Sequence, residues 1–274
     1  MSPTPPPPGL SQARAQRIRD GRREEALDQV IGETPVALLY NGVPHAVMMA
    51  TPCDLQDFAL GFAFSEGIIE RADEFRIVDC LRSEHGISLQ ALIPHARFES
   101  LETRKRTLAG RSGCGLCGVE SLTEAVRPVP RVDSDGRFDA ALIERGLAGL
   151  ARHQPLNERS GGVHAAGYAH PEGILVREDV GRHNALDKLI GALMRDADPL
   201  ASAAWRARTG FLAITSRASY EIVHKAATAG IALVAAISAP TSLAIDLADQ
   251  ANITLIAFAR GAAMNVYTHP HRVG

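Results

Sequence analysis

The sequence is poor in cysteine, it has no P-loop, and it carries almost no excess charge. Four cysteines in 274 residues are too few for the disulfide framework of a small secreted protein, so we expect a reducing compartment. The absence of a Gly-x-x-x-x-Gly-Lys-Ser/Thr pattern argues against a standard NTPase. A formal net charge of −2 gives no global reason to expect a nucleic acid or an anionic membrane as partner.

Long hydrophobic runs are also missing. The most apolar region, residues 229–248, is interrupted by Gly230, Pro240 and Asp246, which suits a buried strand followed by a helix better than a membrane span. The N-terminus is rich in proline and has no apolar core, so it predicts neither a signal peptide nor a membrane anchor. These absences favour a cytoplasmic protein.

Two of the four cysteines lie in one glycine-rich stretch, Arg111-Ser-Gly-Cys-Gly-Leu-Cys-Gly118. Glycine permits backbone conformations that other residues avoid and leaves neighbouring sulfurs uncovered, so the pattern predicts an exposed loop that offers Cys114 and Cys117 outward. Residues 119–126 can form a short helix, whose positive end would favour a thiolate. The basic run of residues 104–106 and Arg111 would act in the same direction.

A lone Cys-x-x-Cys pair leaves three interpretations open. Its thiols can be reactive, they can be half of a structural zinc site, or the spacing can be coincidental. A thioredoxin-type redox pair is disfavoured, because this pair does not follow directly from a strand in a β-α-β unit.

Outside this loop, the pattern predicts a tail and two subdomains. Residues 1–26, proline-rich and then arginine-rich, are expected to be a disordered tail. Residues 27–137 are expected to form an N-terminal α+β subdomain with a hairpin at residues 35–50, turning at Asn41-Gly42. A helix should follow, beginning at Asp54 as its N-cap and ending near Ser65.

The second half, residues 138–274, alternates apolar strands with helices. Unbroken apolar strands indicate a mixed sheet covered on both faces, a three-layer α/β/α domain. In such sheets, ligands bind at the carboxyl ends of the strands. Those ends are rich in hydroxyls, small residues and arginines, which suit a phosphate-bearing ligand: residues 177–184, 215–219, 238–242 and 258–263.

Several polar residues have an ordinary structural interpretation that competes with a functional one. His183 and Asp187 have the i, i+4 spacing of metal ligands on a helix, but a structural or ligand-positioning role is favoured over a metal site. Asp179 is interpreted as an N-cap rather than a catalytic acid. His164, Cys53 and Cys80 are expected to be inert core or surface residues.

The layout also raises the possibility of a zinc deaminase, whose signature pairs His-x-Glu with a later Pro-Cys-x-x-Cys. His170-Pro171-Glu172 occurs here, but it follows the cysteine pair instead of preceding it, and Gly113 stands where the signature has proline. Deaminase chemistry is therefore disfavoured.

Taken together, the motifs resemble those of the FdhD family, the formate dehydrogenase accessory sulfurtransferases. The resemblance extends from about residue 30 to the C-terminus. It rests on the following runs: Phe58–Phe62 with Ser65–Ile69, Gly113–Glu120, Glu178–His183 with Ala185–Lys188, Ser216–Ser219, Ser238–Ser242 and Asn265–Pro270.

The resemblance implies a cytidine deaminase-like fold, a homodimer and a cytosolic sulfur carrier. Such a carrier accepts persulfide sulfur from a cysteine desulfurase and passes it to the molybdenum cofactor, bis-molybdopterin guanine dinucleotide, for formate dehydrogenase. It implies that Cys114 carries the persulfide and that Cys117 assists. It also places the guanine-nucleotide contacts, for which GDP is a mimic, at Phe258, Ala259, Arg260, Gly261, Ala262 and Ala263, where the small Ala262 and Ala263 replace the larger or basic residues of many relatives.

An alternative from another class is a non-catalytic protein that binds the molybdenum cofactor as a chaperone. In that case the Cys-x-x-Cys loop would hold a structural zinc ion or act as a redox pair. A test of whether the purified protein takes up sulfur from a cysteine desulfurase distinguishes the sulfur carrier from the chaperone.

Overall fold

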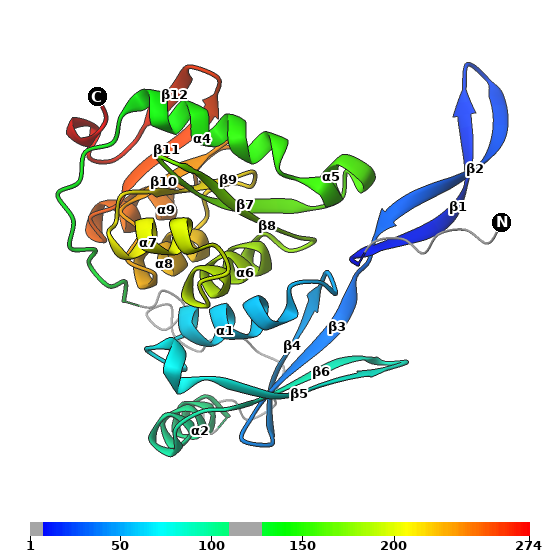
Figure 1. Cartoon of the computed structure of the whole chain (residues 1–274), viewed down its shortest axis with the longest axis horizontal. Coiled ribbons are helices and arrows are strands. Elements are labelled where there is room, and N and C mark those ends of the chain that lie inside the picture. Colours follow the sequence, from blue (N-terminus) through cyan, green and yellow to red (C-terminus); the bar gives the residue numbers. More distant parts are fainter. Residues whose placement is uncertain (1–7, 110–127) are drawn as a thin grey trace.

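The computed structural model describes residues 8–109 and 128–274, with a β-sheet subdomain and a larger α/β part packed against each other (Figure 1). Cys114, Cys117 and the helix expected at residues 119–126 lie outside the described residues.

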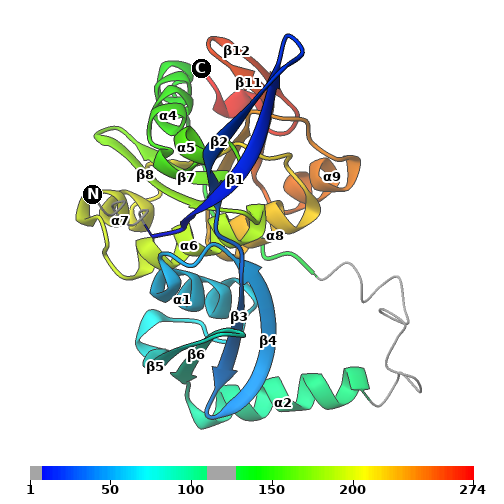
Figure 2. The same ribbon diagram turned by 90° about the vertical axis from the view of Figure 1, so that its right-hand side faces the viewer.

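The chain begins with a projecting two-stranded arm, formed by β1 (Leu10–Arg19) and β2 (Arg22–Ile31) in antiparallel register. Figure 2 shows the arm standing in front of the α/β part. The prediction of a disordered tail was therefore wrong for residues 10–26. The arm was not recognised because most of its side chains are exposed on both faces, so its sequence carries no alternation of apolar and polar residues.

The N-terminal subdomain is a four-stranded sheet in the order β4-β3-β6-β5 with one helix on its inner face. Strands β3 (Thr34–Tyr40) and β4 (Val43–Ala50) form the predicted hairpin, and Asn41 and Gly42 both have positive φ at the turn. Helix α1 (Leu55–Ser65) follows as expected, although Asp54 makes no side-chain capping bond. The remaining strands are β5 (Arg76–Ser83) and β6 (Gly86–Leu92).

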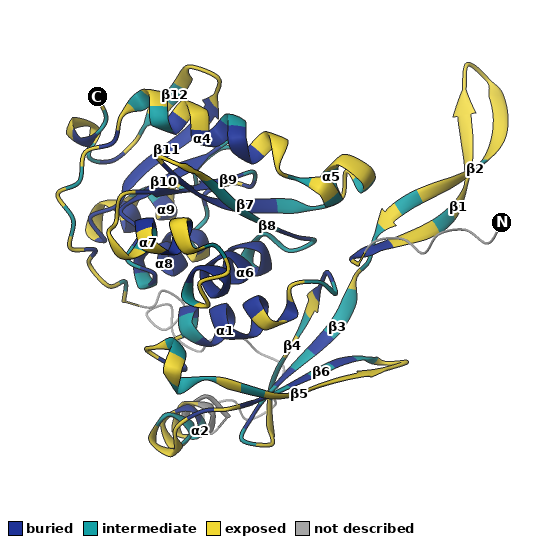
Figure 3. Cartoon of the chain, viewed as in Figure 1, coloured by how far each residue is buried: buried dark blue, intermediate teal, exposed yellow. Residues whose placement is uncertain are grey.

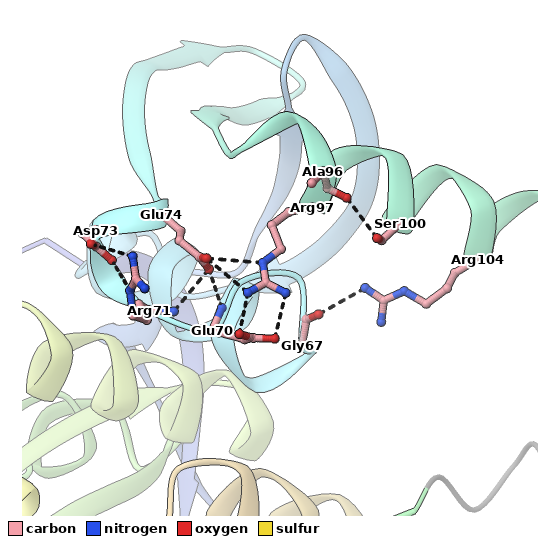
Figure 4. A network of polar contacts seen from close by, with 9 residues as sticks. All are labelled: Gly67, Glu70, Arg71, Asp73, Glu74, Ala96, Arg97, Ser100 and Arg104. Carbon is pink, nitrogen blue, oxygen red and sulfur yellow. Dashed lines mark hydrogen bonds and ion pairs between the residues drawn. The ribbon is translucent and has the colours of Figure 1, made fainter.

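Helix α2 (His95–Ala109) follows β6 and directly precedes the Cys-x-x-Cys stretch in the sequence. A network on the surface fixes its first turns (Figure 4): the Arg97 guanidinium bonds Glu70 at 2.8 Å and Glu74 at 3.1 Å. Glu74 also accepts the backbone N–H of Glu70 and Arg71 around the 3-10 turn η1 (Ala72–Glu74). The network attaches the helix to the loop after α1, and Arg104 adds a bond to the Gly67 carbonyl at 3.1 Å.

The larger part contains a six-stranded sheet in the order β12-β11-β10-β9-β7-β8. Strands β9, β10 and β11 are parallel, β7 is antiparallel to both β8 and β9, and β12 is antiparallel to β11. Their bounds are β7 (His164–His170), β8 (Gly173–Asp179), β9 (Phe211–Ile214), β10 (Leu233–Ala236), β11 (Thr254–Arg260) and β12 (Ala263–Val266).

Helices cover both faces of this sheet. Helix α4 (Ala140–Arg152) lies across one face, and α6 (Arg182–Met194), α8 (Tyr220–Thr228) and α9 (Ser242–Gln250) lie on the other (Figure 1). The shorter α5 (Pro155–Ser160), α7 (Pro199–Arg206) and the 3-10 turn η2 (Pro270–Arg272) complete this part. The arrangement confirms the predicted three-layer α/β/α fold with an additional N-terminal α+β unit.

Burial follows this layering (Figure 3). One apolar core lies between the large sheet and its helices, and a second lies between the N-terminal sheet and α1. Within the described residues, no helix is long and apolar enough to cross a membrane.

Candidate functional site

The carboxyl ends of the parallel strands meet at one edge of the large sheet, as the sequence predicts. The loops after β9 and β10 are joined there: the Ala218 N–H donates to the Ala239 carbonyl at 3.1 Å, and the Thr241 N–H donates to the Ala218 carbonyl at 3.0 Å. The Phe258 N–H donates to the Ser238 carbonyl at 3.1 Å, which attaches the end of β11 to the same rim. We call this edge, residues 215–219, 238–242 and 258–263, the strand-end rim.

Phe258 is the most unusual residue of the rim. Its φ is +52°, and its side chain is 46% exposed. The pairing of β11 with β12 shifts between Ala257 and Arg260, so Phe258 lies in a β-bulge. A bulge redirects a side chain, and a left-handed conformation costs a bulky residue about 1 kcal/mol or more. A large apolar ring held exposed in a strained bulge is typical of a ligand-contacting residue rather than a packing one.

The rest of the segment expected to contact a nucleotide forms a tight turn at the end of the sheet. Arg260 pairs with Ala263 across Gly261-Ala262, and Gly261 has a positive φ. Arg260, Gly261, Ala262 and Ala263 are exposed, whereas Ala259 is buried. The turn therefore offers an exposed guanidinium and exposed backbone groups within a few residues of Phe258 along the chain.

Two helices begin at the rim. Helix α8 starts after Ser219, and α9 starts after Thr241, whose hydroxyl accepts the Ala244 N–H at 3.2 Å. Helix N-termini carry partial positive charge and free N–H groups. With exposed Arg217 and Arg260, they give this edge the donors that phosphate groups require.

Several residues of the Glu178–Lys188 run make buried contacts that stabilise the fold. Asp179 and Lys188 form a fully buried ion pair of 2.7 Å. Asp179 also accepts the Thr51 N–H at 3.0 Å, and Lys188 donates to the Thr51 carbonyl at 3.0 Å. The interpretation of Asp179 as an N-cap was wrong: Gly181 holds that position, and Asp179 joins the two subdomains instead.

Asp187 belongs to a second buried cluster between three helices. It accepts bonds from Ser65 at 2.6 Å and from Lys225 at 2.9 Å. Lys225 also bonds Glu66 at 3.0 Å. Burial alone would lower the Lys225 pKa, but Asp187 and Glu66 outweigh it and raise that pKa above its usual value.

His183 faces a different partner from Asp187. Its Nε2 lies 2.8 Å from Glu221 on α8. Both residues line a pocket of about 150 Å³ that Lys225 and Asp187 also line. Burial lowers the His183 pKa, and Arg182 and Lys225 lower it further, against the opposing effect of Glu221. His183 and Asp187 thus have different partners, Glu221 and Lys225, and the described residues contain no group of three or more candidate metal ligands.

The remaining residues considered from the sequence are His164, Cys53, Cys80 and His170. Burial lowers the His164 pKa. The Cys53 Sγ lies 3.7 Å from the Lys188 Nζ, and burial raises the pKa of the Cys53 thiol. Cys80 is exposed on β5. His170 pairs with Glu172 at 3.0 Å in the turn after β7. Sequence reasoning missed the two buried lysines; the available signal was a lysine on the apolar face of a helix, at Lys188 and Lys225.

A mixed sheet between helical layers, with an exposed aromatic, arginines and two helix N-termini at its strand ends, defines an α/β protein of the type that binds ligands at that edge. A family model for the FdhD/NarQ family matches residues 31–274. The chain belongs to the FdhD/NarQ family.

Curated relatives are similar in sequence to this protein over nearly its whole length. A protein named sulfur carrier protein FdhD from Xanthomonas campestris pv. campestris (strain B100) is 52% identical over 98% of this chain and 94% of its own length. One of the same name from Cupriavidus necator is 48% identical over 97% and 91%. A crystal structure from Desulfotalea psychrophila, described as that of a formate dehydrogenase accessory protein, has a TM-score of 0.72 and 25% identity, and covers 97% of this chain and 100% of its own.

Proposed function

We propose that this protein is a cytoplasmic sulfurtransferase that accepts persulfide sulfur from a cysteine desulfurase and delivers it to bis-molybdopterin guanine dinucleotide for formate dehydrogenase. The observation that supports this most is the combination of a Cys-x-x-Cys pair in this sequence with near-complete similarity to proteins named sulfur carriers. We propose that the carrier acts as a homodimer.

In the loading step, Cys114 is the acceptor. Its thiolate attacks the outer sulfur of the desulfurase persulfide, a new S–S bond forms on Cys114, and the desulfurase cysteine leaves as a thiolate. The exchange consumes no external oxidant or reductant.

In the release step, Cys117 assists. Attack of its thiolate on the Cys114 sulfur frees the outer sulfur as hydrosulfide and leaves a disulfide between the two cysteines, which a thiol reductant resets. The cysteine pair thus supplies the two electrons that reduce the carried sulfur to sulfide.

The strand-end rim is the proposed binding surface for the guanine nucleotide part of the molybdenum cofactor, which is cargo here. Phe258 offers a stacking face, Arg260 offers a guanidinium, and the N-termini of α8 and α9 offer N–H donors. GDP is the corresponding simple ligand. The left-handed bulge at Phe258 supports this role for residues 258–263.

Replacing Cys114 in cells tests the proposal. In a strain that lacks its own carrier, Cys114→Ala is expected to abolish formate dehydrogenase activity, while purified variant and wild type give the same circular dichroism spectrum and unfolding transition. Cys80→Ala, which removes an exposed thiol on β5, serves as the matched control and should retain activity. Full activity in Cys114→Ala would contradict the proposal.

A further inference from the structure

A hollow of about 430 Å³ lies beside α4, away from the strand-end rim. Helix α4, the turn between β7 and β8, and the start of α7 form its walls. Its volume is within the range of small-molecule sites. The side chains that matter for its chemistry are Leu142, Arg145, Arg152, His170, Ile174 and Asp198.

The sheet register separates this hollow from the rim. Strand β7 ends at His170, and its neighbour Ala169 pairs with Phe211, the first residue of β9. The hollow therefore lies at the amino-terminal end of β9, whereas Phe258 lies at the carboxyl-terminal end of β11, a strand that runs in the same direction.

Two arginines of α4 line the hollow, seven residues apart and thus two turns along one helix face. Within residues 8–109 and 128–274, neither Arg145 nor Arg152 has an ion-pair partner. Both are exposed, so both guanidiniums are available to a ligand.

The carboxylates of the opposite wall already have donors. Glu172 pairs with the buried His170 at 3.0 Å, and this bond lowers the Glu172 pKa. Asp198 accepts the N–H groups of Leu200 at 3.0 Å and Ala201 at 3.1 Å as the N-cap of α7. Neither carboxylate forms an ion pair with Arg145 or Arg152.

Apolar groups form part of the lining, beside the polar side chains of His153, His170, Glu172 and Asp198. Gly146 and Gly149 carry no side chains, and Leu142 and Ile174 line the same space. Ile174 packs against Gly149: a Cβ added to Gly149 would lie 3.1 Å from the Ile174 side chain. The surface thus presents two cations on one helix face with the apolar side chain of Ile174 between them.

We propose that this hollow binds an organic dianion, specifically a dicarboxylate with an aliphatic spacer. Each carboxylate pairs with one guanidinium, in the bidentate geometry that arginine favours, and the spacer lies over Gly149 and Ile174. The seven-residue separation corresponds to about 10 Å along the helix, which requires an extended ligand rather than a single compact anion.

Calorimetric titration of the full chain with suberate tests the proposal. Saturable one-site binding is expected, at least tenfold weaker in both Arg145→Gln and Arg152→Gln. Octanoate, which keeps the chain and loses one charge, should bind at least tenfold more weakly than suberate, as should inorganic pyrophosphate, which lacks the spacer. Arg159→Gln, an exposed arginine of α5 outside this hollow, is the matched control and should bind like wild type.

Amide NMR spectra locate the ligand. Suberate should shift the signals of Gly146, Gly149 and Gly173, which line the hollow, and leave that of Gly261 in the rim unchanged. Failure of suberate to saturate, wild-type affinity in either Arg145→Gln or Arg152→Gln, or shifts at Gly261 instead would each overturn the proposal.

Discussion

Gly61 of α1 and Gly191 of α6 lie where these two helices cross in near backbone contact. A Cβ added to Gly61 would lie 1.7 Å from the Asp187 carbonyl oxygen, and one added to Gly191 would lie 1.9 Å from that of Asp57. Backbone atoms cannot move aside as a flexible side chain can, so only glycine allows this approach. The crossing joins the N-terminal subdomain to the α/β part.

Adding a methyl group at this crossing should force the two subdomains apart. Gly61→Ala and Gly191→Ala are each expected to lower the free energy of unfolding by about 2 kcal/mol or more, by overpacking. Urea denaturation measures this. Gly173→Ala, where an added Cβ meets nothing within 4 Å, should be nearly neutral; equal losses at all three glycines would contradict the account of the crossing.

The Asp179–Lys188 ion pair makes a second prediction about the same junction. Lys188→Met leaves Asp179 buried without its cation and should cost about 3–5 kcal/mol of unfolding free energy. Adding Asp179→Asn removes the uncompensated charge, so the double variant should be more stable than Lys188→Met alone. A double variant whose losses simply add would show that the two residues are not coupled.

The lowered pKa of His183 predicts how the free energy of unfolding depends on pH. Because burial holds its folded-state pKa below the unfolded value of about 6.5, the unfolded chain binds the proton more readily. Its contribution to stability is therefore complete at neutral pH and is lost as pH falls from about 6.5 toward the lowered folded pKa.

Urea denaturation of wild type and His183→Gln at a series of pH values between about 7.5 and 5.5 isolates this contribution. Wild type should lose more stability on acidification than His183→Gln does. His85→Gln, at an exposed histidine in the turn before β6, should follow wild type. Parallel curves for wild type and His183→Gln would refute the assignment.

Substitution of Phe258 should affect GDP affinity without a matching loss in the free energy of unfolding. Glycine adopts its left-handed backbone without strain, which offsets the packing lost with a residue that is 46% exposed. Phe258→Gly should thus retain or slightly raise the free energy of unfolding while weakening GDP binding about tenfold or more through lost base stacking. Tyr267→Ala, beyond the far end of β12, is the control for a lost exposed aromatic. Unchanged GDP affinity in Phe258→Gly would exclude the ring from the site.

Local patterns predicted the fold well where one face of an element is buried. The apolar strands of the large sheet are examples, because burial imposes their periodicity. The Asn41-Gly42 turn was predicted from its residue types, which accept the positive φ that both residues have. The β1–β2 arm escaped prediction because neither of its faces is covered along most of its length.

The candidate site was predicted only in part. Parallel strands bring their carboxyl ends to the same edge of a sheet. The position of residues 258–263 at that edge could therefore be predicted from the sequence. The contacts of Asp179 and Lys188 with Thr51, more than a hundred residues away in sequence, depend on subdomain packing that no local pattern encodes. The bulge at Phe258 likewise arises from its pairing with β12, not from its own sequence.

Sulfur loading followed by intact mass spectrometry tests the proposed function most directly. Purified wild type, Cys114→Ser and Cys80→Ser are incubated with a cysteine desulfurase and L-cysteine, and then weighed under non-reducing conditions. Wild type and Cys80→Ser are expected to gain the mass of one sulfur atom, which a reductant removes, and Cys114→Ser to gain none. A wild-type protein that gains no sulfur and instead holds one equivalent of zinc, or a Cys114→Ser variant that loads normally, would contradict the account.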